Sequence, residues 1–270
     1  MHCMKELTLE ELKRIELEIL QRFDAFCKEN GITYFLSSGT LLGAVKYRGF
    51  IPWDDDIDVL VPRKDYNRLL ALFENDARYH LFATERDPAY RYPFAKLCDM
   101  TTRKEEMNVN NGVILGVDID IFPLDAWRSP LARAEREAGR MSRKMLLLGF
   151  SKLKKSDSRT PIKRAIKRLA ICLSKLIGWR FFVRSMTRAA QGAVSKDSAY
   201  LGCKAWPIYG KREILPADVF SETVEVEFEG STFPAPVGYD TYLRSLYGEY
   251  EKDPPPEKQK SHHAFFSYHI

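Results

Sequence analysis

The first thirty residues repeat apolar side chains at helical spacing. Those between Thr8 and Asn30 are Leu9, Leu12, Ile15, Leu17, Ile19, Leu20, Phe23 and Phe26. Thr8 with Glu11 forms a capping-box pattern, and Gly31 is a typical helix stop. The pattern predicts a long amphipathic helix. Acidic residues interrupt its apolar stretch, so the segment does not read as a signal peptide.

Shorter apolar runs follow, and they predict a mixed sheet with flanking helices. Strands are expected at 33–36, 56–61, 79–84, 92–98, 117–122, 212–214, 223–228 and 231–234, and helices at 64–74 and 239–246. A glycine turn and a short helix separate the first two strands. The tail, with three prolines at 254–256 and Ser261-His262-His263, is expected to be irregular. The fold class is therefore α+β.

A basic helical insertion interrupts this pattern over 130–195. Helices are expected at 131–150, 161–176 and 179–193. Residues 128–196 hold 19 Lys and Arg against 3 acidic residues, a charge of +16, whereas the rest holds 23 against 34, a charge of −11. The insertion predicts either an interfacial element on anionic lipid or a helical subdomain with a solvated basic face. Nucleic acid is disfavoured, because no zinc finger, RNP motif or helix-turn-helix accompanies the charge.

The composition is that of an ordinary enzyme, with 45% apolar and 29% charged residues in 270. The five cysteines are scattered and form no Cys-x-x-Cys pair, which favours a reducing compartment, the cytoplasm. The sequence contains no run of eighteen apolar residues, so it predicts no membrane span.

The most informative segment is 38–61, in which a glycine-led helix start precedes four aspartates. Asp56 and Asp58 fall at i and i+2 in an apolar run, so in a strand both would point to one face. Hard oxygen ligands of this kind suit Mg²⁺ or Mn²⁺ holding a substrate phosphate. Ser38, Gly39 and Thr40 open the short helix, whose first N–H groups could face an anion.

Other interpretations of the acidic run are weaker. A solvated turn would not need aspartates inside an apolar run, where an unpaired carboxylate is costly. A calcium loop beginning at Asp54 would need glycine and glutamate where Val59 and Asp65 stand. The run therefore predicts a metal site.

Two further polar residues lie in apolar strands and could complete the site. Asp120 is a candidate third carboxylate, because an unpaired carboxylate in an apolar strand is costly. Asp118, two residues earlier and on the same face of the strand, is a substitute for it. The alternative is that Asp120 faces solvent at the end of the strand. Lys96 is a candidate phosphate contact, or else a lysine on a solvent face.

With these residues in place, the sequence resembles the LicD family of phosphocholine transferases, relatives of the fukutin-type phosphosugar transferases. The motifs that carry the resemblance are Gly39-Thr40-Leu41-Leu42-Gly43-Ala44-Val45, Gly49-Phe50-Ile51-Pro52-Trp53-Asp54-Asp55-Asp56-Ile57-Asp58, Ile119-Asp120-Ile121-Phe122-Pro123-Leu124-Asp125, Ala235-Pro236, Leu246-Tyr247-Gly248 and Ser261-His262-His263. The basic insertion shows the least resemblance.

The resemblance implies a nucleotidyltransferase-like core over 1–129, an insertion over 130–195 and a completion of the core by 196–270. It implies metal binding by Asp56, Asp58 and Asp120 and phosphate binding at the Gly39 turn. The implied reaction transfers phosphocholine from CDP-choline, or a related CDP-alcohol, to a sugar hydroxyl of a teichoic acid or lipopolysaccharide precursor. A lipid-linked acceptor would bring the enzyme to the inner face of the membrane through 130–195.

Several residues are expected near the substrate. Lys46 stands where the family pattern leads us to expect arginine, which keeps the charge but loses bidentate geometry. Trp53 adjoins the acidic cluster, and the aromatic pool for choline is Trp53, Tyr92, Trp127, Trp206 and Tyr209. His262 and His263 are candidates for the acceptor side. Asp120 could bind a second metal or accept the proton from the attacking hydroxyl.

Three rival functions remain at this point. A nucleotide-sugar glycosyltransferase also uses Asp-x-Asp with Mn²⁺, but such folds open with a βαβ unit rather than a long helix. A nucleotidylyltransferase would share the whole metal site and differ only in its products. A noncatalytic module that binds choline or lipid would have no need of the acidic residues.

Overall fold

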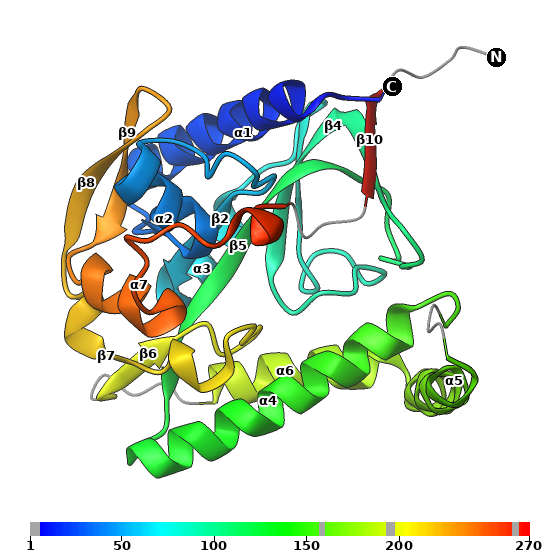
Figure 1. Cartoon of the computed structure of the whole chain (residues 1–270). Coiled ribbons are helices and arrows are strands. Elements are labelled where there is room, and N and C mark those ends of the chain that lie inside the picture. The colour runs from blue at the N-terminus through cyan, green and yellow to red at the C-terminus, as the bar shows by residue number, and fades with distance from the viewer. Residues whose placement is uncertain (1–5, 157–159, 193–197, 261–264) are drawn as a thin grey trace.

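The computed structural model describes residues 6–156, 160–192, 198–260 and 265–270 (Figure 1). A mixed sheet forms its centre, in the order β1 (Phe35–Leu36), β2 (Asp58–Pro62), β5 (Leu115–Trp127), β4 (Ala95–Glu106) and β10 (Phe265–His269). The pair β2 and β5 is parallel, and the other neighbours on this path are antiparallel. The predicted α+β fold with a mixed sheet is confirmed.

Shorter strands extend the centre of the sheet. β3 (Tyr79–Phe82) pairs with β4, while β6 (Tyr200–Gly202) joins the end of β5 to β7 (Leu215–Pro216). A separate hairpin of β8 (Thr223–Phe228) and β9 (Ser231–Pro236) lies at the far left of Figure 1.

Helix α1 (Leu9–Asn30) packs against β4 and β5. The capping box of Thr8 and Glu11 forms as the sequence predicts, and Gly31 ends the helix in the left-handed conformation. Ile19, Leu20 and Phe23 are fully buried. The inward stripe of α1 therefore forms one wall of the main hydrophobic core.

Three shorter helices surround the strands near β2. They are α2 (Ser38–Tyr47), α3 (Arg63–Leu72) and α7 (Tyr239–Tyr247). Both α2 and α3 contact β2, and α7 contacts α2. The N-terminal end of α2 is thereby held close to the start of β2.

The basic insertion forms α4 (Leu131–Lys152), α5 (Pro161–Ile177) and α6 (Trp179–Gln191). Helices α4 and α6 pack through a second apolar cluster made of Met141, Leu148, Phe182, Val183 and Met186. Figure 1 shows α4 and α6 along the lower side of the molecule and α5 end-on at its right edge. No helix in the described ranges combines the length and apolar composition of a membrane span.

One prediction about the C-terminal part was wrong. Residues 212–214, expected as a strand, fall largely in a 3-10 helix, Gly210–Glu213. The tail, expected to be irregular, contains one 3-10 helix, Pro256–Lys258, and its Ser261-His262-His263 lies outside the described residues. The strand β10 that follows was not predicted, and it pairs with residues 102–106 of β4. A strand of this kind is fixed by its partner and not by its own sequence pattern.

Candidate active site

The start of α2 and the acidic segment meet, as the sequence predicts. Thr40 Oγ1 accepts a hydrogen bond of 2.8 Å from the backbone N–H of Asp58. A Cβ atom on Gly39 would lie 2.5 Å from Asp54 Oδ2, so no side chain fits at that position without a shift. The glycine therefore lets the helix start approach the carboxylates closely.

Asp58 and Asp120 lie opposite each other on the parallel strands β2 and β5. Asp56 precedes β2, which begins at Asp58, so the strand predicted over 56–61 starts two residues later than expected and Asp56 and Asp58 do not both lie in it. Burial raises the pKa of Asp58 well above its ordinary value, and the negative charges of Asp56 and Asp120 add to the effect. The three predicted metal ligands are therefore close enough to repel one another.

A cavity of about 390 Å³ has both Asp58 and Asp120 in its lining. Four carboxylates line it, from Asp56, Asp58, Asp118 and Asp120. Four aromatic rings also line it, from Tyr92, Phe94, Phe122 and Trp206. The rings of Phe94 and Trp206 are 5.4 Å apart between centroids, and those of Tyr92 and Trp206 are 5.8 Å apart. The cavity lining thus combines carboxylates, two lysines and aromatic rings.

Lys96 is buried between two of the carboxylates, so the alternative of a lysine on a solvent face is wrong. Its ammonium forms ion pairs with Asp118 and Asp120. Lys104 adds a second ion pair, 3.0 Å from Asp118 Oδ1. Burial alone would raise the pKa of Asp118, but the two ammonium groups hold it down to about 2.

Asp120 has a different environment from Asp118. Burial raises the pKa of Asp120 to about 6, and the neighbouring Lys96 only partly opposes this effect. Asp118 thus forms ion pairs with two lysines, Lys96 and Lys104, whereas Asp120 forms an ion pair with Lys96 alone and lies opposite Asp58. The substitute Asp118 is the less suitable metal ligand of the two.

The residues present fit a divalent cation. Asp54, Asp55 and Asp56 each offer a carboxylate oxygen, and the three oxygens lie within 4.8 Å of one another. Among the described residues this is the one group of three or more such side chains at that spacing, so Asp56 belongs to it, while Asp58 and Asp120, also predicted as ligands, stand outside it. Carboxylate oxygens are the hard donors that Mg²⁺ and Mn²⁺ prefer.

Other predicted site residues lie around the cavity and not in it. Ser38 lines a smaller adjoining hollow, where its backbone N–H donates to the hydroxyl of Tyr242 at 3.2 Å. Lys46 forms an ion pair of 2.6 Å with Asp253. Trp53 packs edge-on against Tyr47, with centroids 6.4 Å apart.

The aromatic residues considered for choline recognition also lie partly in the cavity and partly outside it. Tyr92 and Trp206 line the acidic cavity, and Tyr209 lines the adjoining hollow. Trp127 is buried elsewhere and donates its indole N–H to the backbone of Glu213. His262 and His263 lie outside the described residues.

Sequence reasoning missed two charged residues beside the cavity. Glu16 is fully buried, and neither carboxylate oxygen has a hydrogen-bond partner in the described ranges. Burial raises its pKa well above the ordinary value. Lys152 is buried with its ammonium nitrogen 3.0 Å from the ring centroid of Tyr92, and burial lowers its pKa well below the ordinary value. Glu16 could have been found from the sequence, because a glutamate on the apolar face of α1 is unusual. Nothing in the sequence distinguishes Lys152 from the other lysines of the insertion.

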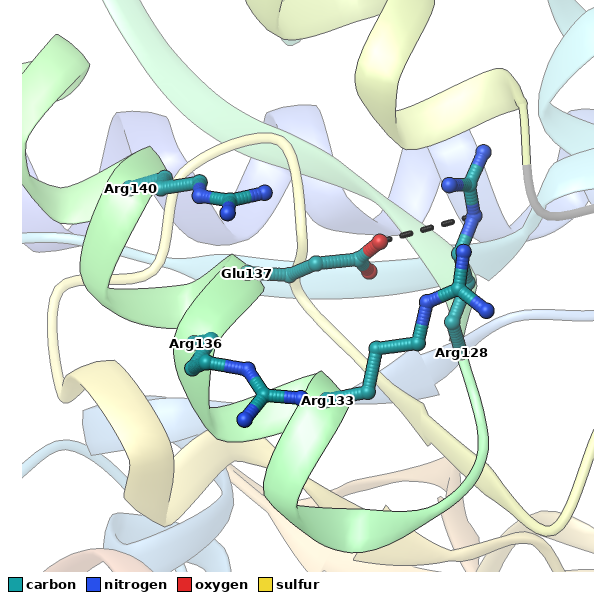
Figure 2. Close-up of a pocket in the computed structure, with 5 residues that line it drawn as sticks. All are labelled: Arg128, Arg133, Arg136, Glu137 and Arg140. Carbon is teal, nitrogen blue, oxygen red and sulfur yellow. Dashed lines mark ion pairs between the residues drawn. The ribbon is translucent and has the colours of Figure 1, made fainter.

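A second hollow, of about 340 Å³, lies on α4 and shares no lining residue with the acidic cavity. Figure 2 shows the side chains of Arg128, Arg133, Arg136 and Arg140 around that of Glu137. Only the pair of Arg128 and Glu137, 3.4 Å apart, is an ion pair among them. This surface carries a net positive charge.

Comparisons with known proteins agree with the geometry. A family model described as the nucleotidyltransferase domain of LicD/FKTN/FKRP matches residues 31–137, which include both acidic strands and the Gly39 turn. The chain is 31% identical over 278 residues to the lipopolysaccharide cholinephosphotransferase LicD of Haemophilus influenzae, covering 98% of this chain and 99% of that protein. It is also 41% identical over 61 residues to an uncharacterized protein of Rickettsia prowazekii, covering 23% of this chain and 20% of that one.

The mixed sheet, the glycine-led helix start and the matched domain define a protein of the nucleotidyltransferase-like class. The similarity to LicD extends over almost the whole chain, so it identifies one family within this class. The chain belongs to the LicD family, as its motifs indicated.

Proposed function

We propose that this protein is a metal-dependent phosphotransferase that moves phosphocholine from CDP-choline to a sugar hydroxyl of a cell-surface glycan precursor. The observation that carries the proposal is the cavity whose lining combines the carboxylates of Asp58 and Asp120, opposite each other on β2 and β5, with several aromatic rings. The full-length similarity to a lipopolysaccharide cholinephosphotransferase supports the same reaction.

Asp56, Asp58 and Asp120 would hold Mg²⁺ or Mn²⁺ in this proposal. A bound divalent cation supplies neutralisation of charge on the donor diphosphate and on the departing CMP. Lys96 keeps Asp118 and Asp120 in place by pairing with both, and as a cation in the cavity lining it would also contact a phosphate oxygen of the donor. At the start of α2, Gly39 and Thr40 would bind phosphate through their N–H groups, with Ser38, whose own N–H donates to Tyr242, beside them.

The reaction forms one bond between the acceptor oxygen and the choline-side phosphorus, and it breaks the bond from that phosphorus to CMP. The hydroxyl proton must leave as the new bond forms. Asp120, whose pKa burial raises to about 6, is the candidate for the acceptor of this proton if its role is that of base and the cation is held by the other aspartates. An Asp120→Asn variant that still binds metal but loses turnover would support the role of base.

The choline end of the donor would lie against Phe94 and Trp206, since the ammonium of Lys152 already lies over the ring of Tyr92. A trimethylammonium group offers no N–H donor, so aromatic faces and nearby negative charge are the means of recognising it. Glu106, which accepts a hydrogen bond of 2.9 Å from the hydroxyl of Tyr92, lines the same cavity and supplies that charge.

The acceptor in this proposal is an anionic, lipid-linked glycan. The arginine-rich hollow of α4 (Figure 2) would favour an acceptor that carries phosphate, and contact with the membrane surface through residues 130–195 would bring the enzyme to it. Nucleic acid has no part in the proposal.

Donor turnover tests the proposal directly. The purified protein is incubated with Mg²⁺ or Mn²⁺, a panel of CDP-alcohols, nucleotide sugars and nucleoside triphosphates, and an extract of glycan precursors. Metal-dependent release of CMP from CDP-choline, lost in Asp56→Ala with Asp58→Ala and kept in the surface variant Asp240→Ala, is the expected result. Turnover of a nucleotide sugar instead would make the protein a glycosyltransferase. Release of pyrophosphate from a nucleoside triphosphate would make it a nucleotidylyltransferase.

A further inference from the structure

Helix α5 has an apolar face that is open to solvent. Six of its large apolar side chains are between 52% and 85% exposed, namely Ile162, Ile166, Leu169, Leu173, Leu176 and Ile177. Their spacing of mostly three and four residues places them on one side of the helix. A stripe of this length on the surface is far more than the scattered apolar residues that any protein exposes.

The neighbouring helices behave differently. The apolar stripes of α4 and α6 are buried against each other in the cluster that contains Met141, Leu148 and Phe182. Helix α5 contacts α4, but only Ile171 and Ser174 of α5 are buried. The exposed stripe is therefore a property of α5 and not of the whole insertion.

The rest of the surface of α5 is basic. Between Pro161 and Ile177 it carries Lys163, Arg164, Lys167, Arg168 and Lys175, and it has no acidic residue. An apolar stripe flanked by Lys and Arg is the pattern of a helix that lies in the interface of an anionic bilayer. A second copy of the chain is a poorer occupant, because two such helices would bring their positive charges together.

The end of α4 links this part of the insertion to the acidic cavity. The backbone N–H of Asn110 donates to the carbonyl of Lys152, and that of Lys154 donates to the carbonyl of Asn108, both at 2.9 Å. Met107 and Val109, in the same loop, line the cavity. The segment that leads into α5 is thus attached to the rim of the cavity.

We propose that α5 binds the surface of a membrane rich in anionic lipid, with its apolar stripe inserted among the headgroups and its lysines and arginines against lipid phosphate. The attachment at Asn108 and Asn110 would then keep the cavity rim near that surface. Membrane binding by α5 is inferred independently of the proposed function. Only its purpose, access to a lipid-linked acceptor, rests on that function.

Vesicle cosedimentation of the full chain tests the inference without donor or acceptor. The probes are vesicles of phosphatidylcholine alone and of phosphatidylcholine mixed with phosphatidylglycerol. We expect binding to the mixed vesicles only, weakened by salt because screening shortens the reach of surface charge from about 10 Å at 0.1 M to about 3 Å at 1 M. Ile166→Ser with Leu173→Ser should weaken binding about tenfold or more, since both inserted side chains are lost.

Leu72→Ser on α3 is the matched control, because Leu72 is 46% exposed but lies outside the insertion. It should bind vesicles like the wild type. Absence of wild-type binding, or equal binding by the double variant, would overturn the inference. So would light scattering that shows a dimer dissociated by the double variant. CMP release measured with a water-soluble acceptor reports on the proposed function separately, and the double variant should keep it.

Discussion

Replacement of Asp58 by asparagine removes one negative charge from the acidic cavity with almost no change in size. Asp58 stands opposite Asp120, close to Asp56, and burial together with these neighbours raises its pKa well above the ordinary value. Without a cation these carboxylates repel one another. We therefore expect Asp58→Asn to be at least as stable as the wild type in metal-free buffer, and to lose about half of the stabilisation that metal gives.

The size of the effect follows from linkage. A cation that binds only the folded state stabilises it by about 2.7 kcal/mol at a concentration of 100 times Kd, and by about 1.4 kcal/mol at 10 times Kd. For a chain of this length each kcal/mol raises Tm by roughly 2–4 °C. Saturating Mg²⁺ should therefore raise the Tm of the wild type by roughly 5–11 °C, and a tenfold weaker site in Asp58→Asn would lose about half of that shift.

Thermal unfolding in EDTA and in Mg²⁺ or Mn²⁺ measures both quantities. Asp240→Asn is the control, since Asp240 lies on α7 and pairs with Arg244 at an exposed position. It should show the full metal-dependent shift. An equal shift in Asp58→Asn and the wild type would refute the assignment of Asp58 as a ligand, and no shift in the wild type with either cation would refute the metal site itself.

Three further substitutions test the surroundings of the cavity. Trp206→Leu should raise KM for CDP-choline roughly 3–10-fold and leave CMP inhibition unchanged, because it removes one aromatic face; steady-state kinetics that show equal effects on both would contradict this. Lys96→Met should lower the free energy of unfolding by about 3–5 kcal/mol in urea titrations, since Asp118 and Asp120 lose a buried partner; a loss below about 1 kcal/mol would count against that ion pair. Burial raises the pKa of Glu213 to about 8, so between about pH 5 and pH 8 the folded state keeps a proton that the unfolded chain has lost. The free energy of unfolding of the wild type should therefore fall with rising pH in this range, by about 1.4 kcal/mol per pH unit more than that of Glu213→Gln. Parallel pH profiles would show that Glu213 titrates normally.

The sequence by itself determined the features that depend on neighbouring residues. The capping box, the apolar spacing and Gly31 gave the bounds of α1 almost to the residue. The helices of the insertion began where their patterns began, because helical periodicity and helix stops are local properties. The approach of the Gly39 turn to the acidic segment was also predictable, since a strand, a glycine turn and a helix in this order bring the helix start to the strand end.

Tertiary structure alone decided what each side chain meets. The register of β2 against β5 sets Asp58 opposite Asp120, and burial together with two lysines separates the roles of Asp118 and Asp120. The strand β10 exists because β4 offers an edge for it. The exposed stripe on α5 looks the same in sequence as the buried stripes of α4 and α6. Contacts between residues far apart in the chain depend on register, burial and the packing of whole elements, which no local pattern records.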